Sequence, residues 1–146
     1  MSLNAKLTSV EYTVFIHATE DYNKVIKAVE NLLPPKIRSR MSIKVEETLG
    51  HYNNPIRIAK VSFRNPEQAN QALSWIWNAL SSEEKTYILT NLDLHIDEKM
   101  RLHVRLDKQG AFLGLVKLSF GDDVVKVVFS FKGPSQDAIR ALLLSL

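Results

Sequence analysis

Residues 101–114, RLHVRLDKQGAFLG, carry the residue types best suited to contacting an anionic ligand. Aliphatic and polar residues alternate over the first half of this stretch, which predicts a strand with one buried and one polar face. A charged break follows before an apolar run resumes. Arginine and lysine on such a face can hold the phosphate groups of a nucleic acid. The candidate contacts in this stretch are Arg101, Arg105, Lys108 and Gln109.

A second group of cations begins after a Pro-Pro pair that ends a predicted helix. Four cations fall within nine residues with no acid among them, and three more, Arg57, Lys60 and Arg64, follow in a predicted strand. The turn between them adds a histidine and a tyrosine, and an aromatic ring can stack on an unpaired base. The same cations could instead form a solvated face or pair with nearby carboxylates. The candidate RNA contacts here are Lys36, Arg38, Arg40, Lys44, His51, Tyr52, Arg57 and Lys60.

Constellations for catalysis or metal binding are weak. His17 lies four residues before Asp21, which leaves a hydrolase using this pair as an alternative. No nucleophile stands at a recognisable spacing, so a non-catalytic histidine at a strand-to-helix junction is the simpler interpretation. Asp93, His95 and Asp97 would share one face of a strand, but no second histidine lies nearby, which favours solvated carboxylates. The chain has no cysteine, and we expect neither a metal nor a cofactor.

Trp75 lies outside the apolar arc of its predicted helix. An exposed tryptophan often marks a protein interface, although this one could also pack on the helix that follows. The alternative to RNA binding is therefore a protein-interaction adaptor or a homo-oligomer, such as a homodimer, that acts through its helical face.

Composition indicates an ordinary globular chain. It has 146 residues, 45% hydrophobic residues and a net charge of +3, so we expect one domain over residues 1–146. So small a positive charge permits RNA binding but does not require it. The sequence contains no apolar run as long as a membrane span and no evident secretory signal, and we expect a cytoplasmic protein.

Periodicity and turn residues predict an α+β fold, with a largely antiparallel sheet and helices packed on one face. The order is β-α-β-β-α-α-β-β-β-α, and residues 92–97 could be a helix end, a loop or a strand. The apolar alternation slips near Ala59, which suggests a bulge. The predicted strands cover residues 10–18, 43–49, 56–64, 101–106, 115–120 and 124–131, and the predicted helices cover 19–33, 66–80, a segment from 81 onward, and 135–146.

Three segments together resemble an archaeal family of small RNA-binding proteins. They are HATEDYNKVIKAVENLLP (residues 17–34), GHYNNPI (50–56) and RLDKQGAFLG (105–114), with GDDVV (121–125) after them. That family is described as a predicted exosome-associated subunit and was formerly a domain of unknown function. The resemblance implies a fold similar to the ribosomal protein that binds five-S RNA. It also implies a non-catalytic accessory of RNA processing, with RNA and exosome or ribosomal proteins as partners.

Family positions carry over residue by residue, and two departures stand out. The family usually has a His-Gly pair where this chain has Tyr52 and Asn53. It usually has an acidic residue and a tyrosine where this chain has Gly110 and Phe112, so a polar role at position 112 is in doubt. The matching residues are His17, Thr19, Glu20, Asp21, Gly50, His51, Asn54, Pro55, Arg105, Asp107, Lys108, Gln109 and Gly114.

Overall fold

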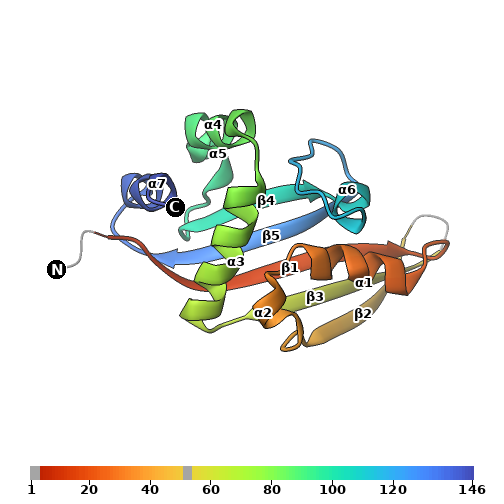
Figure 1. Ribbon diagram of the computed structural model, residues 1–146. Coiled ribbons are helices and arrows are strands. Elements are labelled where there is room, and N and C mark those ends of the chain that lie inside the picture. Colours follow the sequence, from red (N-terminus) through yellow and green to blue (C-terminus); the bar gives the residue numbers. More distant parts are fainter. Residues whose placement is uncertain (1–3, 51–53) are drawn as a thin grey trace.

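A computed structural model describes residues 4–50 and 54–146 of the chain. Five strands form one sheet in the order β2-β3-β1-β5-β4, and each neighbouring pair is antiparallel (Figure 1). In chain order, the elements are β1 (Lys6–His17), α1 (Tyr22–Asn31), α2 (Pro35–Arg38), β2 (Ile43–Leu49), β3 (Pro55–Phe63), α3 (Pro66–Ala79), α4 (Ser82–Thr90), α5 (Leu92–His95), β4 (Arg101–Asp107), α6 (Lys108–Phe112), β5 (Val124–Lys132) and α7 (Gln136–Leu144).

The two faces of the sheet differ in what covers them. Strand residues such as Tyr12, Val61 and Phe129 are buried in one core with apolar residues of the helices. Figure 1 shows α1, α2 and α3 lying across this face. The predicted α+β class, the largely antiparallel sheet and the succession of its main elements are confirmed.

The opposite side of the sheet, called the open face below, carries the strand side chains that alternate with the buried ones. All of them except the buried Val124 of β5 are exposed or half-buried. They include Ser9, Glu11, Thr13, Phe15 and His17 of β1, Lys44, Glu46 and Thr48 of β2, Ile56, Ile58, Lys60 and Ser62 of β3, Arg101, His103 and Arg105 of β4, and Lys126, Val128 and Ser130 of β5.

The longer helices α1, α3, α4 and α7 begin at short polar side chains that accept a backbone N–H of the first turn. Asp21 accepts from Asn23 N at 2.8 Å and begins α1. Ser81 and Glu84 form a reciprocal capping box at the start of α4. None of the helices in the described ranges is long and apolar enough to cross a membrane.

The predicted strand at residues 115–120 is wrong. Asp107 caps α6 by accepting from Gly110 N at 2.7 Å, so the chain turns into a helix directly after β4. Gly114, with φ of +84°, then reverses the chain. The segment that follows runs back beside β4 and makes one bridge, between Leu118 and Leu106. Residues 92–95, which the sequence left open, form the short helix α5.

The predicted bulge near Ala59 is also wrong. The register of β3 with both neighbours runs without a break through Ala59. The apolar alternation slips because Ile56 and Ile58 lie on the open face, whereas Ala59 and Val61 face the core. The irregular register lies instead in β1, between Leu7 and Ser9.

Candidate nucleic-acid interface

A row of cations crosses the open face from one sheet edge to the other. Lys44 of β2 pairs with Lys60 of β3, and Lys60 pairs with Thr13 of β1. Thr13 pairs with Lys126 of β5, and Lys126 pairs with Arg105 of β4. Neighbouring strands lie roughly 4.8 Å apart, so these five positions, the cationic row, span about 19 Å. The row therefore presents four positive side chains in a line perpendicular to the strands.

Lys126 is a member of the row that the sequence reasoning did not select. Its exposed position in β5 alternates with the buried Val125 and Val127, so its outward direction could have been predicted. Its neighbours could not, because the pairing of β5 with β1 joins segments more than a hundred residues apart.

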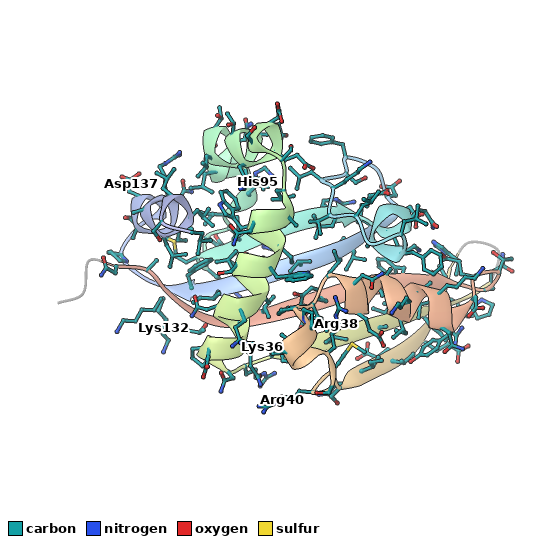
Figure 2. The ribbon with its side chains drawn as sticks, viewed as in Figure 1. Lys36, Arg38, Arg40, His95, Lys132 and Asp137 are labelled. Carbon is teal, nitrogen blue, oxygen red and sulfur yellow. The ribbon has the colours of Figure 1, made fainter. Side chains whose placement is uncertain are left out.

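The predicted cations around α2 lie on the other side of the sheet. Figure 2 shows Lys36, Arg38 and Arg40 on or beside α2, in the helix layer. Arg38 donates from Nε to Leu33 O at 2.9 Å, and its guanidinium lies 5.8 Å from the centre of the Trp75 ring. Of the described cations in this second predicted group, Lys44 and Lys60 are therefore the ones on the open face.

Arg57 also faces the helices. It pairs with Ile16 of β1, whose side chain is in the core, and its guanidinium lies 5.1 Å from the centre of the Tyr22 ring in α1. The sequence grouped Arg57 with Lys60, but three positions along a strand place the two side chains on opposite faces.

Arg101 and His103 lie on the open face as predicted, but both are bound to Asp97. Arg101 Nε lies 2.7 Å and His103 Nε2 lies 2.8 Å from Asp97 Oδ2. Partial burial would raise the pKa of Asp97, but hydrogen bonds from His103 and Arg101 hold that pKa well below its usual range. The charge of Arg101 is therefore partly compensated, and Arg105 is the β4 cation that completes the row.

Lys108 does not fit the predicted role of an RNA contact, because it is only 3% exposed. Its ammonium lies 2.9 Å from Glu20 Oε2 and 2.7 Å from Asp123 Oδ1, and it donates to Phe15 O at 3.2 Å. Lys108 thus ties the end of β1 to the loop before α1 and to the turn before β5. The alternation of β4 ends at Asp107, so the strand pattern could not show that Lys108 turns inward.

The two carboxylates that contact Lys108, those of Glu20 and Asp123, each have a second neighbour in the structure. Partial burial would raise the pKa of Asp123, but hydrogen bonds from Lys108 and Gln109 lower it. Gln109 Nε2 donates to Asp123 Oδ2 at 3.0 Å, so this predicted RNA contact also holds the turn. The carboxylate beside His17 is that of Glu20, at 4.0 Å, whereas Asp21 caps α1. The described structure therefore provides no hydrogen bond between His17 and Asp21.

Two hollows flank Arg105 on the open face. One, of about 600 Å³, is lined by Phe15, Ile56 and Val124 together with charged side chains that include Lys126. The other, of about 300 Å³, lies at the β4 edge and is lined by aromatic rings and by Arg105. Its rings are those of Tyr87, His95, His103 and Phe120, and Tyr87 meets His95 and Phe120 edge to face. We call these the Phe15 hollow and the Phe120 hollow.

The remaining predicted residues have different outcomes. His51 and Tyr52 lie outside the described residues. Within the described ranges, no three side chains of the types that bind metals lie close enough to hold an ion. Trp75 is 38% exposed, donates from Nε1 to Asn31 O at 3.3 Å, and lines a largely apolar hollow of about 740 Å³ on α3.

Fold and site together define a small α+β protein with an open, cationic sheet face flanked by exposed aromatic rings. Residues 9–131 match the family described as RNA binding. An RNA-binding protein of Pyrococcus abyssi is 34% identical over 125 residues, which cover 85% of this chain and 81% of that protein. An uncharacterised protein of Methanocaldococcus jannaschii is 35% identical over 128 residues, covering 86% and 85%.

The fold is shared as well. The crystal structure of a protein from Archaeoglobus fulgidus matches with a TM-score of 0.82 at 28% identity, over 96% of this chain and 99% of that one. The chain therefore belongs to this RNA-binding family.

Proposed function

We propose that this protein binds RNA through its open face, without catalysing a reaction. The observation that carries the proposal is the cationic row, because one register across five strands aligns Lys44, Lys60, Lys126 and Arg105. Family membership and the RNA-binding name of the Pyrococcus abyssi relative support it.

The row would work by neutralising backbone phosphates and releasing the cations that surround them. Four phosphate contacts to a single strand predict a slope of about −3 in a plot of log affinity against log salt. Such contacts position the backbone but do not read the sequence of bases. Glu11 and Glu46 also lie on the open face, which confines the attraction to the row.

The test compares two variants that lose the same charge. One changes Lys44, Lys60 and Lys126 to Gln and removes most of the row. The control changes Lys24, Lys27 and Lys85 to Gln and removes three cations from the helices α1 and α4. We expect the row variant to bind labelled RNA at least tenfold more weakly in filter binding, with a flatter salt slope. Equal losses in both variants would contradict the proposal, since net charge alone would then explain binding.

We further propose that the protein is a cytoplasmic accessory of RNA-processing machinery, such as the exosome, or of ribosome-related particles. The support is the resemblance of three segments to a family described as a predicted exosome-associated subunit, with a fold similar to a ribosomal protein. A tagged protein should co-purify with exosome subunits or ribosomal particles from its own cells. Nuclease treatment separates contact through RNA, which it abolishes, from direct protein contact, which it leaves intact.

A second candidate function is protein interaction through α3, favoured by the hollow beside Trp75. Its lining is largely apolar and includes Pro34, Trp75 and Ala79. A change of Trp75 to Ala would then shift the sedimentation of the protein or remove a partner without altering RNA binding. Unchanged assembly would count against this candidate.

A further inference from the structure

We propose that the open face takes single-stranded RNA, with one phosphate on Arg105 and the two adjoining bases in the Phe15 and Phe120 hollows. This inference rests on the proposed function and adds the substrate class and a base-binding site to it. Arg105 is the residue that the two hollows share. Arg105 thus lies between the two hollows, as a phosphate lies between two successive bases of an RNA strand.

The Phe15 hollow offers apolar side chains on which a base can stack. Phe15 is a central-strand residue but 36% exposed, and Ile56 lies beside it on the open face. Glu20, Asp122 and Asp123 also line this hollow, together with the cations Arg105, Lys108 and Lys126. Because Lys108 is already paired with Glu20 and Asp123, it leaves Arg105 and Lys126 as the cations available to a phosphate, and Phe15 and Ile56 as the apolar surface available to a base.

Lys126 links the Phe15 ring to the row. Its Nζ lies 5.8 Å from the centre of the ring, a contact of the cation–π type. A base that stacked on Phe15 would take the place of this ammonium, which would then be free to pair with a neighbouring phosphate. The neighbouring side chains Phe15 and Lys126 would therefore hold a base and a phosphate, respectively.

The Phe120 hollow offers a second aromatic platform. Phe120 is 80% exposed, and its ring centre lies 5.3 Å from that of Tyr87 in an edge-to-face arrangement. Tyr87 in turn meets the His95 ring at 5.7 Å. A phenylalanine that exposed gains little from burial in this fold, whereas stacking on an unpaired base would cover one of its faces.

Arg105 can hold a phosphate without giving up its place in the fold. Its guanidinium has five N–H donors. Among the described residues it makes one hydrogen bond, from Nη2 to Gly121 O at 2.8 Å. The remaining donors suit a phosphate group. A duplex keeps its bases stacked inside the helix, so it cannot fill the two hollows at once.

The test measures fluorescence anisotropy of a short single-stranded RNA and of a duplex of the same charge. The variants are Phe15→Leu and Phe120→Leu, which keep an apolar side chain but remove the ring. The matched control is Phe112→Leu on α6, because Phe112 is also 36% exposed and has Lys24 Nζ 6.0 Å from its ring centre. Phe15→Trp restores a ring at the first site.

We expect Phe15→Leu and Phe120→Leu each to lose fivefold or more in single-strand affinity. Fivefold is the smallest expected loss, because the stacking of one base on an aromatic ring contributes at least about 1 kcal/mol. Duplex affinity and the Phe112→Leu control should stay within twofold of the original protein, and Phe15→Trp should bind the single strand normally. Equal losses of affinity for both RNAs, or no loss, would overturn the two base sites. If the row variant still bound RNA more weakly in that case, the proposal of RNA binding through the cationic row would stand. No binding by any form would overturn both proposals.

Discussion

The burial of Lys108 gives the sharpest test of which cations support the fold and which contact RNA. A change of Lys108 to Met keeps the length of the side chain but removes the ammonium between Glu20 and Asp123. Both carboxylates then lose their nearest positive charge, and Phe15 O loses a donor.

The size of the effect follows from how exposed the partners are. Breaking a fully buried ion pair costs about 3–5 kcal/mol. The side chains of Glu20 and Asp123 are 22% and 49% exposed, so water would compensate part of the loss. We therefore expect the free energy of unfolding to fall by about 2 kcal/mol, which corresponds to a melting temperature lower by roughly 8 °C for a chain of this size.

The assay is thermal unfolding followed by circular dichroism at pH 7, with Lys27→Met as control. Lys27 contacts Glu30 at 3.8 Å and is 55% exposed, and such surface pairs contribute about 0–1 kcal/mol. The pKa of Asp123 is lowered in the folded state, so its stabilisation is present above its unfolded pKa near 3.9 and is lost as the pH falls through the folded value. The deficit of Lys108→Met should therefore shrink below about pH 4.

RNA binding supplies the second arm of this test. Lys108→Met should leave the salt slope unchanged, whereas Lys126→Gln should reduce its magnitude by about 0.7, the contribution of one phosphate. A variant that melts within 2 °C of the original protein, or that loses salt dependence as Lys126→Gln does, would refute the structural role of Lys108.

Three further predictions concern other groups around the sheet. Changing Asp97 to Asn should lower the free energy of unfolding by about 1–2 kcal/mol at pH 7, because charge-assisted hydrogen bonds are lost. Urea unfolding should show a smaller difference from the original protein at pH 3, because that pH lies below the unfolded pKa of the carboxyl. Changing Arg57 to Gln should alter RNA affinity less than twofold in filter binding, since Arg57 faces the helices. Changing Tyr12 to Phe should cost about 1 kcal/mol in urea unfolding, because the buried hydroxyl donates to Leu32 O at 3.2 Å.

Local sequence patterns were sufficient for most of the fold. The alternation in β1 and β4 predicts which side chains are buried, and the Asn65-Pro66 pair predicts the start of α3. The failures occur where one polar side chain redirects the chain. Asp107 could be read as part of a polar break, but by capping Gly110 N it begins the helix α6 at the next residues.

The site depended on information that no local pattern contains. Lys44 and Arg105 lie 61 residues apart in sequence and at opposite edges of the sheet, and only the pairing of all five strands places them in one row. The sequence found most members of the row as separate groups. It missed Lys126, because one lysine among valines gives no local sign of a cluster.

The apolar residues of the open face are the part of the pattern that a purely electrostatic interface does not explain. β1 carries apolar side chains on both faces and is the central strand of the sheet, yet no described helix covers its second face at Phe15. The same holds for Ile56 and Ile58, whose outward positions were misread as a bulge. A surface that met phosphates alone would gain nothing from these residues. Single-stranded RNA with unpaired bases would use both features, because its phosphates pair with cations and its bases stack on apolar side chains.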